Sequence, residues 1–291
     1  MASMQELKRR MESITVTHKI TKAMKMLSTV KLNRFKTTLY KTKDFYQEFY
    51  EVIGAIITNY NKMIANKNQS EQTTKSDKKL WIVISTQLGL CGSYNTNIGK
   101  LLANEIGKND QVILIGNKLN SYLKTRNLDN RIIQSFSVND KQIDFDWSYI
   151  LGKQILELNE KNKYESINCI YTTYINNLNF QAKKIQLMPA DPSIFDAKTL
   201  DSINDKFPKN ISFEPSVDVI IPALEEQLLQ VILYGCLIES KVCEYASRRN
   251  AMDTAAKNAD DLYNKYKLLY NQLRQAKITQ EINEIVAGAA K

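Results

Sequence analysis

Two long stretches of the sequence lack the residues that break helices, and they decide most of what this chain can fold into. The first glycine is Gly54, and all five prolines lie between Pro189 and Pro222. After Pro222 only Gly235 and Gly288 remain as breakers. Because proline and glycine are the residues that most often interrupt a helix, the pattern predicts one long helix at each end and a middle region of different structure.

Both stretches carry apolar residues at the alternating four- and three-residue spacing of a coiled coil. In the N-terminal stretch the spacing is apolar at all positions but one; the positions are Leu32, Phe35, Leu39, Thr42, Tyr46, Phe49, Ile53, Ile56, Tyr60 and Met63. In the C-terminal stretch it runs from Leu224 to Leu273 and is interrupted only at Gly235 and Arg249. Such spacing predicts a left-handed coiled coil. One helix enters the middle region and the other leaves it, so we expect an antiparallel pair, each helix spanning roughly 90 Å.

Residues 20–35, ITKAMKMLSTVKLNRF, depart from this pattern. The coiled-coil register becomes polar there, at His18, Thr21, Lys25 and Ser28, while apolar residues occupy other faces of the helix. The net charge of +9 also comes from this end, because residues 1–43 hold eleven Lys or Arg and only two Glu. A helix that only covers a core keeps its apolar residues on one stripe. This surface is either a solvated face or, as we expect, a contact surface for an acidic partner.

The middle region reads as alternating strands and helices. Strands are predicted at 79–85, 111–116, 166–175, 180–189 and 210–215, and helices at 93–106 and 146–162. A strand, a helix and a second strand in succession predict an open, mainly parallel α/β sheet of Rossmann-like type. We therefore expect three parts: an N-terminal helix over 1–66, an α/β domain over 79–216 and a C-terminal helix over 217–291.

The composition argues against several classes of function. The turn after the first strand contains Gly89 and Gly92, but their spacing is not that of a dinucleotide or phosphate-binding loop, so a tight turn is the simpler reading. His18 is the only histidine and the four cysteines form no CxxC pair, so we predict no metal, no cofactor and no catalytic site. No apolar run is long enough to cross a membrane, and the N-terminus lacks the pattern of a signal peptide. Unpaired cysteines fit a reducing, cytoplasmic location.

Four segments resemble, in order, the gamma subunit of F-type ATP synthases. They are ITKAMKMLSTVKLNRF (20–35), LGLCGSYNTNI (88–98), IESKVCEYASRRNAMDTAAKNADDL (238–262) and LRQAKITQEINEIVAGAA (273–290). The resemblance spans the chain and is weakest from about 120 to 205. It implies a non-catalytic central rotor subunit: an asymmetric shaft of two helices turns inside a ring of alpha and beta subunits and couples ion flow to ATP synthesis or hydrolysis. The α/β domain would be a foot that meets the epsilon subunit and the membrane rotor ring.

The resemblance also implies contact residues. The shaft would meet acidic lever loops of the beta subunits through Lys19, Lys22, Met24, Lys25, Arg274, Gln275 and Thr279. An apolar collar of the ring would hold the tip at Ile278, Ile282 and Ile285, and Gly89, Cys91 and Gly92 would form a turn of the foot. Gln87 and Leu88 stand where the family usually has an Asp-Arg pair, and Asn283 stands where it has an apolar residue.

Three alternatives follow from the same residues. One is the rotor of a divergent ATP-driven motor built from the same catalytic ring. The second is a basic coiled-coil protein that binds nucleic acid, and the third is an enzyme for a small molecule on the α/β domain. The resemblance favours neither of the last two alternatives, because it implies that the chain binds no nucleic acid. It also implies that the chain does not insert into the membrane and lies, as part of the complex, at the periphery of the cell membrane on its cytoplasmic side.

Overall fold

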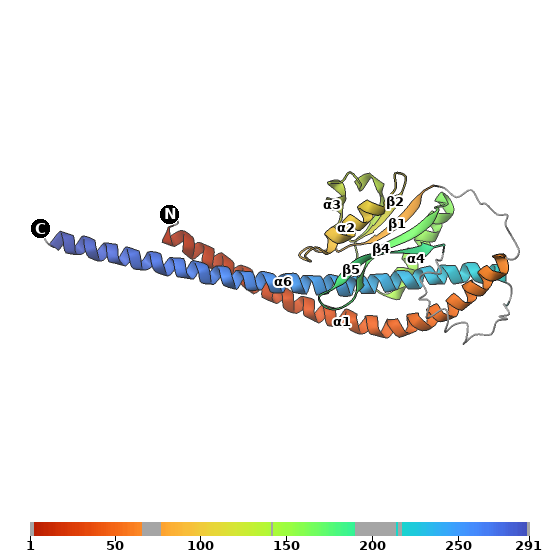
Figure 1. Ribbon diagram of the computed structural model, residues 1–291, viewed down its shortest axis with the longest axis horizontal. Coiled ribbons are helices and arrows are strands. Elements are labelled where there is room, and N and C mark those ends of the chain that lie inside the picture. Colours follow the sequence, from red (N-terminus) through yellow and green to blue (C-terminus); the bar gives the residue numbers. More distant parts are fainter. Residues whose placement is uncertain (1–2, 66–76, 141, 190–213, 215–216, 290–291) are drawn as a thin grey trace.

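Two long antiparallel helices dominate the computed structural model, which describes residues 3–65, 77–140, 142–189, 214 and 217–289. Helix α1 (Met4–Ala65) and helix α6 (Val217–Ala289) lie side by side, with both chain termini at the same end (Figure 1). The α/β domain sits beside α6 toward the other end, and α6 extends past the start of α1. The predicted fold class is confirmed. None of the helices in the described ranges is long and apolar enough to cross a membrane.

The predicted coiled-coil register is the one that the two helices use. On α1 every position of the register from Leu7 to Thr42 is buried or half-buried, including the polar positions; these are Leu7, Met11, Ile14, His18, Thr21, Lys25, Ser28, Leu32, Phe35, Leu39 and Thr42. On α6 the same holds from Leu224 to Leu273. The side chains at four further predicted positions are not among those that the structure describes; these are Tyr46, Ile53, Tyr60 and Met63. The polar stretch of the register is therefore still the face that meets the partner helix.

The α/β domain is built on a five-stranded sheet of order β3-β2-β1-β4-β5. Its strands are β1 (Lys79–Ile84), β2 (Gln111–Ile115), β3 (Ile132–Phe136), β4 (Ser166–Tyr174) and β5 (Phe180–Met188). The first four run parallel, and β5 pairs antiparallel with β4. The four strands predicted within the described residues are present, and β3 was missed. The strand predicted at 210–215 lies outside the described residues except for Glu214.

Helices cover both faces of the sheet. Helices α2 (Tyr94–Glu105) and α3 (Asn120–Lys124) pack on one face, and a 3-10 turn, η1 (Asp129–Arg131), precedes β3. Helix α4 (Phe145–Asn162), which begins where the Asp144 side chain accepts a 2.9 Å hydrogen bond from the Trp147 backbone, packs with α6 on the other face. One of the two helices of the coiled coil is thus also a covering helix of the sheet.

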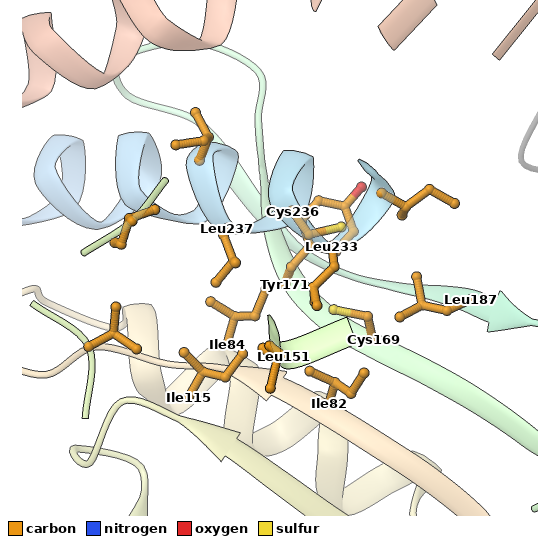
Figure 2. Close-up of a cluster of buried hydrophobic side chains, with 14 of the residues drawn as sticks. Ile82, Ile84, Ile115, Leu151, Cys169, Tyr171, Leu187, Leu233, Cys236 and Leu237 are labelled. Atoms are coloured by element: carbon orange, nitrogen blue, oxygen red, sulfur yellow. The ribbon is translucent and has the colours of Figure 1, made fainter. Parts of the chain in front are cut away.

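The core between α6 and the sheet joins the coiled coil to the α/β domain. Leu233, Cys236 and Leu237 of α6 point toward Ile82 and Ile84 of β1 (Figure 2). All five side chains are buried, and each fully buried aliphatic side chain contributes about 1.5–3 kcal/mol. Any rotation of α6 about its own axis must therefore carry the sheet with it.

Candidate functional site

A second apolar stripe runs along α1 on the side that faces away from α6. It consists of Val16, Ile20, Ala23, Leu27 and Val30, and we call it the outer stripe. Its large members are 54–69% exposed, and the neighbouring Met26 is equally open. The stripe keeps the four- and three-residue spacing but is displaced by two positions from the register that meets α6. At about 100° per residue this places it on roughly the opposite side of the helix.

On the face of α1 that meets α6, small polar residues replace apolar ones along the segment that carries the outer stripe. Thr21 and Ser28 are almost fully buried against α6. The Thr21 hydroxyl donates hydrogen bonds to the carbonyl oxygens of Thr17 and His18. The Ser28 hydroxyl donates a 2.7 Å hydrogen bond to the carbonyl oxygen of Met24. Because their hydroxyls are satisfied within α1, these residues need no polar partner from α6. The apolar residues of this segment are thereby left for solvent or for another molecule.

The basic residues that the sequence singled out fall into two groups. Lys19 and Lys22 are exposed beside the outer stripe, and within the described residues neither has an ion-pair partner. Lys25 instead lies at the seam, where its Nζ is 2.5 Å from Oδ1 of Asp253 on α6. The hydrogen bond from Lys25, with a second one from Lys257, lowers the pKa of Asp253. Met24 is half-buried.

The C-terminal end of α6 forms a tip that α1 does not reach. Ile278, Ile282, Ile285 and Val286 are 47–70% exposed there, and Arg274, Gln275 and Thr279 are exposed with them. The Thr279 hydroxyl donates 3.0 Å to the carbonyl of Gln275. In Figure 1 this part of α6 projects alone beyond the N-terminus. This exposed apolar stripe makes the tip a candidate contact surface.

The turn after β1 is fastened to α6. Arg248 donates hydrogen bonds of 3.0 and 3.3 Å to the carbonyl oxygens of Leu88 and Gly89. The Ser247 hydroxyl donates a 2.6 Å hydrogen bond to the carbonyl oxygen of Cys91. Cys91 is buried, while Leu88 is exposed at the surface of the turn. Gly92 closes the turn in the left-handed region, with φ of +56°. A backbone held at three carbonyl groups has little freedom to move relative to α6.

The contacts of α6 with this turn lie at the carboxyl edge of the parallel strands. Open parallel sheets bind ligands beyond the carboxyl ends of their strands. Here side chains of α6 occupy that place, because Arg248 and Ser247 bond the turn after β1 while Tyr245 bonds Asp140 in the segment after β3. The predicted tight turn is therefore a docking point for the long helix.

Sequence reasoning missed a cluster of charged side chains and one tyrosine beneath this turn. We call it the joint: Lys31 of α1, Asp140, and Lys241, Glu244, Tyr245 and Arg248 of α6. Nζ of Lys241 is 2.9 Å from Oε2 of Glu244 and 3.5 Å from Oδ1 of Asp140. Nη2 of Arg248 is 2.8 Å from Oε1 of Glu244, and Nζ of Lys31 is 2.6 Å from Oδ2 of Asp140. The joint links both long helices to the α/β domain.

Most charges of the joint are buried. The side chains of Lys241, Glu244 and Arg248 are each less than a tenth exposed. Burial by itself raises the pKa of Asp140, but hydrogen bonds from Lys31 and Tyr245 outweigh it, so the pKa is lowered. Burial, together with the bond to Asp140, raises the pKa of Tyr245 far above its ordinary value. Asp140 is thus held as a carboxylate, and Tyr245 as a neutral donor.

Comparison with known proteins gives a consistent result. A family model described as ATP synthase matches residues 3–291. The chain is 79% identical to the ATP synthase gamma chain of Mycoplasmoides gallisepticum over the whole of both chains, and 38% identical to that of Mycoplasma pneumoniae over 99% of each. Two solved structures share its fold. The Tetrahymena thermophila mitochondrial ATP synthase central stalk matches with TM-score 0.62 and 24% identity over 81% of this chain and 99% of that one. The Euglena gracilis mitochondrial ATP synthase rotor matches with TM-score 0.65 and 16% identity over 94% and 98%.

Proposed function

Because the chain belongs to the family of ATP synthase gamma chains, the central-stalk rotor subunits of F-type ATP synthases, we propose how its surfaces divide the work. Residues 1–66 and 217–291 are the shaft, which turns inside the ring of alpha and beta subunits. Residues 79–216 are the foot, which meets the epsilon subunit and the membrane rotor ring. The joint and the core under α6 make the foot turn with the shaft.

The outer stripe is the observation that carries this proposal. A helix with apolar residues on two opposite sides has a partner on each side, and α6 accounts for only one of them. The outer stripe supplies apolar contacts for the surrounding subunits, and the exposed ammonium groups of Lys19 and Lys22 beside it supply charge for acidic lever loops on the beta subunits. Arg274, Gln275 and Thr279 supply polar contacts nearer the tip.

The shaft acts through its asymmetry. It has one uneven cross-section, with the outer stripe on one side and α6 on the other, so at any moment each beta subunit meets a different surface. Moving a two-state subunit from 1:99 to 99:1 requires about 5.5 kcal/mol of differential contact energy. A few apolar and charged contacts reach this value, since one buried aliphatic side chain contributes about 1.5–3 kcal/mol. By linkage, nucleotide binding in the ring drives the shaft in return.

The tip serves as the bearing of this shaft. Ile278, Ile282 and Ile285 form one stripe that α1 leaves uncovered. An apolar collar at the top of the ring would bury this stripe and still allow rotation, because apolar contacts have no fixed direction. The coiled coil ends near Leu273, so the bearing consists of a single helix, which suits a narrow collar.

We assign no catalytic step to this chain. Support comes from the carboxyl edge of the sheet, where Arg248, Ser247 and Tyr245 of α6 stand in the place that a ligand takes in related open sheets. ATP would be made or hydrolysed by the ring, and this chain would carry torque. The chain belongs to the peripheral part of the complex, and we place that part on the cytoplasmic side of the cell membrane.

Substitutions in the outer stripe test the proposal. Ile20, Leu27 and Val30 replaced together by serine should leave the free chain folded, since these side chains are already exposed, but should reduce its recovery in complex with alpha and beta subunits. Leu178→Ser is the matched control, because Leu178 is 74% exposed on the foot, in the turn between β4 and β5. Equal recovery of the triple variant and the control would remove the outer stripe from the interface.

A further inference from the structure

Among the side chains that the structure describes, four polar contacts join α1 to α6 in a single register, and we call them the ladder. They are Arg10 Nη1 to Tyr266 Oη at 3.3 Å, His18 Nε2 to Asp260 Oδ2 at 3.4 Å, Lys25 Nζ to Asp253 Oδ1 at 2.5 Å, and Lys31 Nζ to Tyr245 Oη at 3.3 Å. Successive contacts step along the two helices in opposite directions by about two helical turns. Every basic side chain comes from α1, and every acidic or phenolic partner comes from α6.

The ladder occupies the segment in which the seam is poorest in apolar side chains. Between its contacts lie Thr21 and Ser28, whose hydroxyls bond within α1. Facing α6 residues such as Ala256 and Ala259 are small. Small residues at seam positions pack almost as well after a shift of one heptad, so apolar contacts alone specify the axial register weakly here. Polar groups at seam positions are the usual means of specifying it.

We propose that the ladder is a register lock that prevents α6 from sliding along α1 when the shaft carries torque. A slide of one heptad in one direction would bring His18 against Lys267 and Lys31 against Met252, and only Lys25 would find a new carboxylate, that of Asp260. A slide in the other direction would move Lys25 from Asp253 to the buried Ala246. Exposed ion pairs add little to overall stability, so the lock selects one register among several that are close in free energy.

The lock rests on the proposed function, but it can be tested on the full chain alone by disulfide trapping. Thr21→Cys with Ala256→Cys reports the observed register, because residues 21 and 256 face each other in the ladder's spacing. Thr21→Cys with Arg249→Cys reports the slide of one heptad that takes Lys25 from Asp253 to Ala246, the direction in which Lys25 finds no carboxylate. The four native cysteines are buried, and the single-cysteine variant Thr21→Cys measures any reaction with them.

Each reporter is combined with three changes at the same rung. Lys25→Asp breaks the rung and sets two carboxylates against each other, and Lys25→Asp with Asp253→Lys rebuilds it with the charges exchanged. Lys25→Met removes the charge without repulsion and covers the case in which Lys25→Asp unfolds the coiled coil. Lys265→Asp, at an exposed position of α6 outside the ladder, is the matched control.

The lock predicts that slid-register trapping rises roughly two- to fivefold in Lys25→Asp, as expected for the loss of one exposed ion pair. It should return to the starting level in the charge exchange and stay unchanged in Lys265→Asp. Unchanged slid-register trapping in both Lys25 variants, or no recovery on charge exchange, would overturn the lock. A separate measurement, rotation of the variants inside the ring of alpha and beta subunits, tests the rotor function itself. There the charge exchange restores torque if Lys25 acts through the rung, but fails to do so if Lys25 acts on the acidic levers.

Discussion

Arg248 and Leu88 are separated by 160 residues in the sequence, yet Nη2 of Arg248 donates a 3.0 Å hydrogen bond to the backbone carbonyl of Leu88. The same guanidinium is 2.8 Å from Glu244 one turn earlier on α6. One side chain thus bonds the long helix to the turn after β1 while its charge is balanced within the helix. Arg248 is thus one of the side chains that connect the shaft to the foot.

Removing Arg248 should therefore cost much more stability than removing its neighbour. Arg248→Ala leaves the buried Glu244 with Lys241 alone and frees two backbone carbonyls, and breaking a buried pair in this way costs about 3 kcal/mol or more. Arg249→Ala is the control, because Arg249 is only half-buried and, among the described residues, makes a single side-chain hydrogen bond, of 3.4 Å to Asn250. Denaturant unfolding of both variants measures the difference. Equal losses for the two would contradict the role given to the joint.

The joint should also give the protein an acid-sensitive component of stability. The pKa of Asp140 is lowered in the folded state from its ordinary value of 3.8. A group with a depressed folded pKa stabilises the fold above its unfolded pKa, and this contribution is lost as the pH falls below about 3.8 toward the folded pKa. The free energy of unfolding of Asp140→Asn should be lower near neutral pH and should fall less steeply with acid. Parallel pH profiles of the variant and the parent would show that Asp140 does not titrate in this way.

Reversal of the free lysines should affect rotation without affecting the fold. In Lys19→Glu with Lys22→Glu, ATP-driven turnover of the assembled ring under load should drop at low salt, because we propose that both lysines meet acidic levers of the beta subunits. The melting temperature of the isolated chain should hardly change, since both side chains are exposed and have no ion-pair partner among the described residues. Lys25 is left intact because it pairs with Asp253. Normal turnover of the double variant at low salt would refute the acidic-lever contact.

Deleting residues 278–291 should separate folding from assembly. The removed part of α6 lies beyond the reach of α1, so the thermal unfolding of the free chain should be unchanged. Recovery with alpha and beta subunits should fall, because up to about 1.5–3 kcal/mol of burial is lost for each isoleucine. Complex recovered in full, with unchanged thermal stability, would mean that no collar grips the tip.

The long-period patterns were predictable, and the long-range polar contacts were not. The register of the coiled coil could be read because every position that meets the partner helix recurs at a fixed spacing, even where it is polar. Strands β1 and β2 could be read because they are continuous apolar runs. Strand β3 was missed because it is a short edge strand in which Gln134 and Ser135 interrupt the apolar residues.

The joint could not be predicted from the sequence for a different reason. Charged residues are expected at the surface, and nothing local shows that Lys241, Glu244 and Arg248 are buried. Their spacing of three and four residues does place them on one face of α6, next to the apolar face that covers the sheet, and this was the available signal. The pairing of Lys25 with Asp253 was hidden as well, because it depends on the exact register of two helices more than two hundred residues apart.

The central claim is that this chain is the turning part of the motor, and single-molecule rotation tests it most directly. The chain is assembled with alpha and beta subunits fixed to a surface, and a probe is attached to the foot through a cysteine introduced in place of the exposed Leu178. The account predicts stepwise rotation of the probe in one direction when ATP is added, and no ATP hydrolysis by the chain alone. A foot that stays still while the ring hydrolyses ATP at its full rate would contradict the account.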